Sequence, residues 1–176
     1  MSSSDEIIHC FPYHGEKITE LFKYSKESLP LVNFFNRSAK NCIKQLISRV
    51  FVIKNHKSQI VGFMAISLKS IEKEKLEKSK TGSMYNRPAI VIGQLIIDEN
   101  FQGKGYGKKA IGFVIRIAYM LKKFLPCRLL FVEAINDEAK TFYEKQGFKG
   151  FAEDPYTLVL DLLPIFSEFE KSSQKK

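Results

Sequence analysis

Hydrophobic positions in the first half of the chain follow a helical period and then a strand period. Apolar residues recur every three or four positions over 31–46, and a shorter set of this kind spans 18–22, so the pattern predicts two leading helices. Two β-branched and aromatic runs within 49–67 then flank a polar segment at 55–58. This arrangement predicts a β-hairpin.

The second half of the chain alternates between strand and helix patterns. A strand is predicted over 88–98, a helix from Lys108 that Pro126 ends, a strand over 128–134 and a helix over 137–146, followed by a closing pair of strands. A strand, a helix and a second strand in succession form a right-handed crossover between parallel strands. The chain is therefore predicted to be an α/β protein with a mixed sheet.

Two segments lack a sustained apolar face. Charges alternate over 69–87, which predicts a solvated excursion from the sheet. The polar, basic end at 167–176 is predicted to be disordered. The rest of the chain, 1–166, is expected to form a single domain, because 176 residues with 44% hydrophobic content are enough for one core.

Composition and net charge limit the cellular compartment and the partners that we expect for the protein. The 28 Lys and Arg against 19 Asp and Glu give a net charge of +9, which admits a polyanionic partner without requiring one. Cys10, Cys42 and Cys127 show neither CxxC nor metal-ligand spacing, so we expect reduced thiols in a cytoplasmic protein and no metal site. No signal peptide and no run near the ~18 apolar residues of a membrane span is visible, so no membrane partner is expected.

The stretch with the clearest chemical meaning is "DENFQGKGYGKKAI" at 98–111, where three glycines lie between the predicted strand and the predicted helix. Backbone N–H groups in such a loop, together with the positive end of the helix dipole, create a site for an anion. The spacing of the residues must then distinguish between possible anions.

Three common motifs do not match this spacing. A P-loop places four residues between its glycines and a hydroxyl after its Lys, but only three residues separate Gly103 from Gly107, and a second Lys follows Lys108. A dinucleotide motif requires GxGxxG and an acidic residue about 20 positions later, which the apolar helix lacks. "KGYG" matches half of an RNA-recognition octamer, but the helical periodicity after it places Tyr106 at the start of a helix.

Two blocks of the sequence resemble the GNAT superfamily of N-acetyltransferases. Gln102-x-x-Gly105-x-Gly107 resembles the pyrophosphate loop with which that superfamily binds acetyl-coenzyme A (acetyl-CoA). "EAINDEAKTFYEKQGF" at 133–148 resembles its second conserved block, and the distance between the two blocks is also similar. The resemblance covers about residues 10–162.

The remaining resemblance is to a narrower group, the GNAT toxins of bacterial toxin–antitoxin pairs, which acetylate the amino acid on charged tRNA. The segments at 31–53 and 88–98 are similar to the corresponding helix and strands of these toxins. At two places the sequence departs from the pattern of these toxins, and both departures bear on the acceptor substrate. "YSKESLPL" at 24–31 replaces an acidic, glycine-containing segment, and Gln94 stands where Arg is common.

The resemblance implies a fold and a set of cofactor contacts. The fold is the GNAT fold, a mixed, mostly antiparallel central sheet with helices on both faces and a splayed pair of parallel strands that admits the pantetheine arm. The residues it assigns to acetyl-CoA are Leu95, Ile96 and Ile97 on the first splayed strand, Gln102, Gly103, Lys104, Gly105, Tyr106, Gly107 and Lys108 in the loop, and Asn136 and Ala139 in the second block.

The resemblance also implies a catalytic residue. Tyr143, from the Phe-Tyr pair of the second block, corresponds to the residue that donates a hydrogen bond or proton to the leaving thiolate. A phenol with a pKa of about 10 remains protonated at pH 7. The alternative is that Tyr143 is only a core aromatic residue. Glu133 and Asp98, at the ends of the two splayed strands, are candidate general bases, although an α-amine with a pKa of about 8 is already partly neutral.

Three functional hypotheses follow. The leading one is an acetyl-CoA-dependent N-acetyltransferase that acts as a toxin on the α-amine of aminoacyl-tRNA, with charged tRNA, an antitoxin protein and a second copy of the chain as partners. The first alternative is a housekeeping GNAT enzyme that acetylates a protein N-terminus, a lysine or a small amine. The second is a non-catalytic acetyl-CoA- or RNA-binding module, which an intact Tyr143 argues against.

Overall fold

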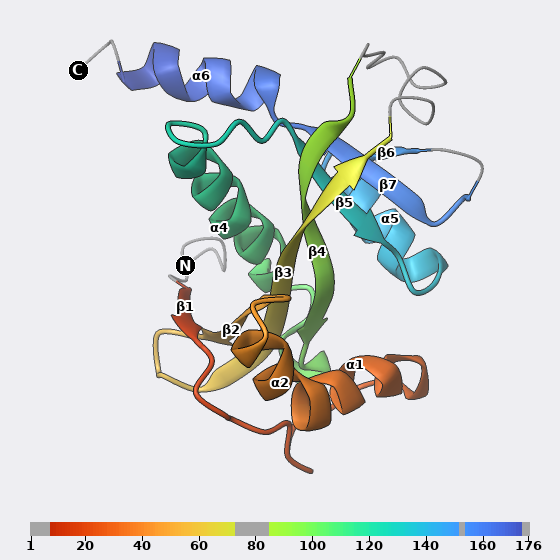
Figure 1. Cartoon of the computed structure of the whole chain (residues 1–176). Coiled ribbons are helices and arrows are strands. Elements are labelled where there is room, and N and C mark those ends of the chain that lie inside the picture. The colour runs from red at the N-terminus through yellow and green to blue at the C-terminus, as the bar shows by residue number, and fades with distance from the viewer. Residues whose placement is uncertain (1–7, 73–84, 152–153, 174–176) are drawn as a thin grey trace. The chain divides into compact units, whose positions relative to one another are not determined.

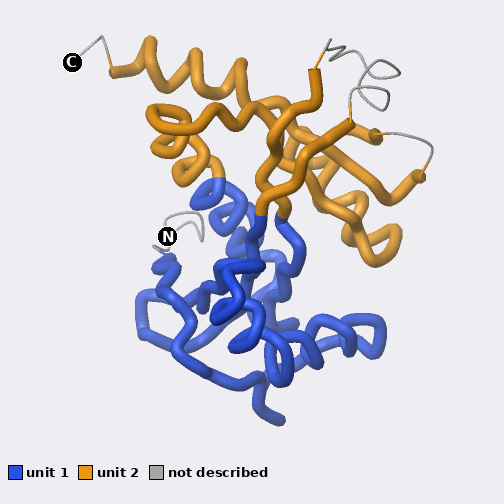
Figure 2. The backbone as a smooth tube through the Cα atoms, viewed as in Figure 1, with its two compact units in different colours: residues 1–67, 92–114 blue, residues 68–91, 115–176 orange. Residues whose placement is uncertain are grey.

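A computed structural model describes residues 8–72, 85–151 and 154–173 (Figure 1). The chain forms two compact units (Figure 2). Unit 1 comprises Met1–Ser67 and Ile92–Val114, and unit 2 comprises Leu68–Val91 and Ile115–Lys176. The single domain over 1–166 stays a prediction. None of the helices in the described part of the chain has the length and hydropathy of a membrane span.

The sheet is mixed, as the sequence predicted. Its strands are β1 (His9–Pro12), β2 (Arg49–Lys54), β3 (Ile60–Ile71), β4 (Arg87–Ile97), β5 (Leu129–Glu133), β6 (Lys149–Gly150) and β7 (Thr157–Asp161). Their order is β1-β2-β3-β4-β5-β7-β6. The β1–β2, β2–β3, β5–β7 and β6–β7 pairs are antiparallel. The neighbours β4 and β5 are joined by a crossover helix, the connection that parallel strands require.

Helices account for most of the remaining described chain. They are η2 (Lys26–Ser28), α1 (Leu29–Asn33), η3 (Phe34–Ser38), α2 (Ala39–Lys44), η4 (Glu99–Phe101), α4 (Tyr106–Leu121), α5 (Asp137–Lys145) and α6 (Leu163–Ser173). The elements α1, η3 and α2 follow one another without a break. The helix that the pattern over 31–46 predicted is therefore one helical run over 29–44, with a π-helical turn in its middle. Strand β1 was not predicted from the sequence.

The predicted hairpin is formed by β2 and β3, and Asn55 builds its turn. The buried Asn55 side chain accepts hydrogen bonds from the N–H groups of Lys57 and Gln59, at 2.9 and 3.0 Å. Strand β3 extends beyond the predicted hairpin to Ile71. The middle of the predicted excursion, 73–84, lies outside the described residues.

Aromatic side chains form the core of unit 1. The ring of Phe63 on β3 lies 5.3 Å from Phe35 and 5.9 Å from Phe22, measured between centroids, and 6.5 Å from Tyr13. The Tyr13 hydroxyl also donates to the Phe35 carbonyl at 3.0 Å. These contacts attach the N-terminal segment and the α1–α2 run to the strands.

The predicted helix over 18–22 is wrong, because the chain makes only a turn there. The side chain of Asn36 clamps the backbone of Ile18: its carbonyl oxygen accepts from the Ile18 N–H at 2.8 Å, and its amide donates to the Ile18 carbonyl at 3.0 Å. Backbone groups that are bonded to a side chain in this way are not available for helical hydrogen bonds. Ile18 and Phe22 therefore become buried without a helix.

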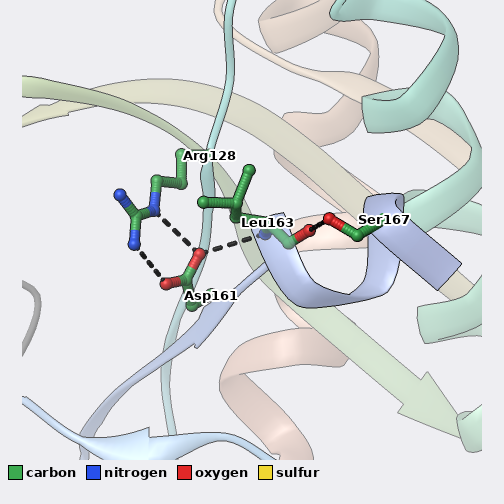
Figure 3. A network of polar contacts seen from close by, with 4 residues as sticks. All are labelled: Arg128, Asp161, Leu163 and Ser167. Atoms are coloured by element: carbon green, nitrogen blue, oxygen red, sulfur yellow. Dashed lines mark hydrogen bonds and ion pairs between the residues drawn. The ribbon is translucent and has the colours of Figure 1, made fainter.

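The core of unit 2 lies on the end of β3, on β4, β5 and β7, and on the residue after β6. Its buried members are Ile71, Ala89, Leu129, Phe131, Phe151 and Val159. At the end of β7, the Asp161 carboxylate accepts two hydrogen bonds from Arg128, at 2.9 and 2.7 Å, and a third from the N–H of Leu163, at 3.1 Å (Figure 3). Asp161 therefore caps the first turn of α6.

The predicted disordered end over 167–176 is wrong as far as Ser173, because α6 includes 167–173. The helix is held by packing: the ring centroids of Phe166 and Phe169 lie 5.4 and 5.3 Å from that of Tyr119 on α4. A polar sequence that contains two well-placed aromatic residues can therefore be ordered by tertiary contacts. The last three residues, 174–176, lie outside the described residues.

Candidate active site

The glycine loop in unit 1 begins with a cap. The Asp98 side chain, which is buried, accepts hydrogen bonds from the N–H and the side-chain amide of Asn100, at 2.9 and 3.0 Å. The Asp98 N–H donates to the carbonyl of Val61 on β3 at 3.0 Å. These bonds fix the direction in which the chain leaves β4. Because its carboxylate is already committed to the turn, Asp98 is better explained as a structural residue than as a general base.

Two glycines then give the loop an open surface. Gly103 has φ +71° and Gly105 has φ +81°, a left-handed backbone that strains other residues. A Cβ atom placed on either glycine would meet no atom within 4 Å. The loop therefore has space for a ligand close to its backbone, and a side chain at either glycine would project into that space.

Polar side chains keep the loop compact and positive. The Gln102 amide donates to the Ile97 carbonyl at 3.1 Å, so the loop folds back on the end of β4. The Lys104 ammonium donates to the Asn100 carbonyl at 2.8 Å and lies 5.1 Å from the centroid of the Phe101 ring. Both Gln102 and Lys104 are exposed. The loop thus presents a cation beside its glycines.

Helix α4 starts inside the glycine motif at Tyr106, which the sequence analysis placed at the start of a helix, two residues before the apolar periodicity that begins at Lys108. Tyr106, its first residue, is buried and packs edge-on against Phe101, with 5.9 Å between ring centroids. The Lys109 N–H donates to the Gly105 carbonyl at 3.1 Å. Gly107 and Lys108 therefore belong to the first helical turn. With the helix dipole, this geometry suits an anion.

The strand end at 95–97 is positioned by a close approach of β3. A Cβ atom on Gly62 would lie 2.6 Å from both the Ile96 carbonyl and the Ile97 side chain, so only glycine fits at that position. Ile96 is buried, whereas Leu95 and Ile97 are partly exposed. The structure thus brings 95–97 and 102–108 together within unit 1. Their contacts with acetyl-CoA stay a prediction.

The second block forms helix α5 in unit 2, with the termini that the sequence predicted. The Asn136 side chain accepts from the Ala139 N–H at 2.9 Å, which is an N-cap. Gly147, with φ +90°, ends the helix. In this cap the Asn136 side chain and the Ala139 N–H bond to each other. The contacts with the cofactor that the resemblance assigns to these two residues stay a prediction.

Tyr143 lies on α5 within an aromatic cluster. Its ring centroid is 5.1 Å from that of Phe142 and 5.3 Å from that of Phe148, and its residual exposure is 6%. Burial raises the pKa of the Tyr143 phenol well above its usual value, so the hydroxyl stays protonated. Among the described residues, the Tyr143 hydroxyl has no hydrogen-bond partner. It is therefore available to donate to a bound group.

Glu133, the other candidate base, is exposed at the end of β5. Its carboxylate lies 3.5 Å from the Lys69 ammonium, and that ammonium also lies 4.2 Å from the centroid of the Phe131 ring. The side chain of Glu133 is 65% exposed. The Glu133 carboxylate is solvated and paired with a cation, so no structural feature of the described residues marks it as catalytic.

Sequence reasoning missed the residues that shape the loop from outside the motif. The cap formed by Asp98 and Asn100 has a local signal, since an acidic residue that ends a strand and precedes a turn is a typical cap. Gly62 has no comparable signal, because its role depends on the approach of another strand.

Comparison with known proteins identifies relatives of the chain. Residues 47–150 match the acetyltransferase (GNAT) domain family. The tRNA-acetylating toxin of Mycobacterium tuberculosis (strain ATCC 25618 / H37Rv) is 28% identical over 114 residues, which are 64% of this chain and 68% of that toxin. These matches confirm three predictions: the resemblance to the GNAT superfamily that the two sequence blocks indicated, the class of enzyme, and acetyl-CoA as the donor.

Two solved structures have a similar fold. AtaT complexed with acetyl-methionyl-tRNAfMet has a TM-score of 0.76 at 22% identity, covering 93% of this chain and 99% of that chain. A mutant of the toxin AtaT bound to the C-terminus of the antitoxin AtaR and acetyl-CoA has a TM-score of 0.73 at 22% identity, with the same coverage of 93% and 99%. At this level of identity the two structures support the fold.

Proposed function

The chain belongs to the GNAT acetyltransferase family, and we propose that it transfers the acetyl group of acetyl-CoA to the α-amine of an aminoacyl-tRNA and acts as a toxin. The observation that carries the acetyl-transfer proposal is the glycine loop at the start of α4. There, two left-handed glycines leave open space beside the N-terminus of a helix, where the helix dipole favours an anion.

The diphosphate of acetyl-CoA fits the chemistry of this loop. A doubly charged anion gains from the N–H groups of a helix start, from the dipole and from a nearby ammonium such as that of Lys104. A Cβ atom on Gly103 or Gly105 would occupy the open space beside the backbone. We assign the diphosphate to 102–108 and the pantetheine arm to the backbone of 95–97.

The chemical step requires a neutral amine and a protonated donor for the leaving group. The amine nitrogen forms a bond to the thioester carbonyl carbon, the carbon–sulfur bond breaks, and the sulfur receives a proton while the amine loses one to solvent. Tyr143 holds its proton because burial raises the pKa of its phenol. It donates that proton to the sulfur as negative charge develops there, and the phenol then regains a proton from solvent. No residue needs to act as a base for an α-amine with a pKa of about 8.

Two kinds of observation support the proposed acceptor: the exposed cationic side chains of unit 1 and the acceptors named for related proteins. Lys40, Lys44 and Arg49 are exposed in unit 1 and give it cationic positions for a phosphate backbone. The lysines of 73–80, which the sequence analysis included in the same basic surface, lie outside the described residues. A relative that is a tRNA-acetylating toxin and a structural neighbour complexed with an acetylated aminoacyl-tRNA support the same acceptor. An antitoxin protein and a second copy of the chain remain proposed partners.

The decisive experiment incubates the enzyme and labelled acetyl-CoA in parallel reactions with three kinds of acceptor. These are a pool of charged tRNA, a mixture of peptides, and a set of small amines. We expect label on charged tRNA and arrest of growth when the chain is expressed. Label on peptides or small amines alone, with harmless expression, would instead establish the housekeeping alternative.

A further inference from the structure

A second surface lies beside the glycine loop in unit 1. It is formed by the segment 17–29, which runs from β1 to the start of α1. The carbonyl of Lys23 accepts a hydrogen bond from the N–H of Glu99, the first residue of η4, at 3.0 Å. The segment therefore passes directly beside the start of the loop to which we assign the diphosphate of acetyl-CoA.

This segment holds Tyr24 in a defined place. Two anchors precede it, in addition to the hydrogen bond described above. The Asn36 side chain clamps both backbone groups of Ile18, at 2.8 and 3.0 Å. Phe22 is 6% exposed, with its ring 5.9 Å from that of Phe63. A side chain directly after three anchors is pre-organised, which lowers the entropy cost of binding to it.

The outward side chains of this segment are large and apolar. Leu21 is 87% exposed, Tyr24 is 37% exposed and Leu29 is 48% exposed. Exposed apolar side chains on a segment that is hydrogen-bonded to the start of the cofactor loop make that segment a candidate for ligand contact. The charged members of the segment are Lys17, Glu20, Lys23, Lys26 and Glu27, a balance of three positive against two negative.

The combination indicates the kind of ligand. A nearly neutral charge balance does not suit a duplex, which is bound mainly through its phosphates. An aromatic ring with a few lysines beside it is how proteins bind single-stranded nucleic acid, because any base can stack on the ring. The aminoacyl end of a tRNA is such a single strand, and it ends in an adenosine whose ribose carries the amino acid.

We propose that Tyr24 is the platform on which the terminal adenine of the aminoacyl-tRNA stacks, and that Lys23 and Lys26 contact the phosphates next to it. Leu21 and Leu29 border the base. This inference rests on the proposed function. Stacking at Tyr24 places the amino acid, which is attached to the same nucleoside, beside the end of β4, to which we assign the pantetheine arm.

The test compares two small acceptors that differ only in the adenosine. One is a hydrolysis-resistant aminoacyl-adenosine, in which an amide replaces the ester, and the other is the simple amide of the same amino acid. The KM of the simple amide divided by the KM of the aminoacyl-adenosine measures what the adenosine contributes to binding. We expect Tyr24→Ala to reduce that ratio by about tenfold or more, as for the loss of one base stack. Tyr24→Phe keeps the ring and should keep the ratio.

Phe124→Ala is the matched control, because Phe124 is an exposed aromatic residue, 83% accessible, outside this segment. An unchanged KM ratio in a folded Tyr24→Ala variant that still acetylates charged tRNA overturns the stacking proposal alone. A wild-type enzyme that acetylates neither the aminoacyl-adenosine nor charged tRNA, but does acetylate peptides, overturns the proposed function and this inference with it. A wild-type ratio close to one also overturns the stacking proposal.

Discussion

Replacement of Tyr143 by Phe separates the catalytic hydroxyl from the packing of its ring. The ring lies in an aromatic cluster with Phe142 and Phe148, at centroid distances of 5.1 and 5.3 Å, and the substitution leaves those contacts in place. Removal of a positioned proton donor typically costs a factor of about 10²–10⁴ in turnover, equivalent to about 2.7–5.4 kcal/mol in the activation barrier. The affinity for acetyl-CoA should change little.

The stability of the variant provides an independent check. The hydroxyl makes no hydrogen bond within the described residues, so its removal breaks none and should leave the free energy of unfolding unchanged or slightly higher. We therefore expect Tyr143→Phe to have low kcat and an equal or higher Tm, measured by single-turnover kinetics and thermal unfolding. A variant that keeps most of its turnover, or that loses stability and activity together, would show that Tyr143 is a packing residue.

The pH dependence of the wild-type enzyme follows from the same assignment. Activity should rise with pH as the α-amine of the acceptor loses its proton, at a pKa of about 8. Burial raises the pKa of the Tyr143 phenol, so the donor is not lost over the same range and no fall in activity from this group should follow up to about pH 10. A decline that begins near pH 8 and disappears in Tyr143→Phe would contradict this account.

Three further predictions concern the loop, the α6 cap and the basic surface. Gly105→Asp places a side chain and a negative charge in the open space of the loop, and calorimetry should show that acetyl-CoA binding is abolished while the protein remains folded. Arg128→Met should cost about 1 kcal/mol of unfolding free energy, because its pair with Asp161 is 37% and 25% exposed and therefore partly screened. Hydrogen bonds from Arg128 lower the pKa of Asp161, so this contribution is present above about pH 4 and is lost as pH falls through the lowered pKa, which urea titrations should detect. Lys40→Gln with Lys44→Gln should weaken the salt dependence of KM for charged tRNA and leave the KM of an amino-acid amide unchanged, whereas an unaltered salt slope would place tRNA elsewhere.

The sequence by itself determined the features that depend on local backbone chemistry. The glycine loop, the Asn136 cap and the Gly147 terminus of α5 were all predicted and are present. Each depends on residues that lie within a few positions of one another, so their spacing in the sequence already specifies the geometry. The two conserved-block resemblances identified the family for the same reason, because both blocks are continuous in the chain.

Only the tertiary structure decided the features that join distant residues. Asn36 holds Ile18 in a turn where the local pattern predicted a helix, and Phe166 orders the chain end by packing on Tyr119. Gly62 permits the approach of the strand end at 95–97. In each case the contact joins residues separated by at least eighteen positions in the chain, and its free energy outweighs the weak preference of the local sequence for another conformation.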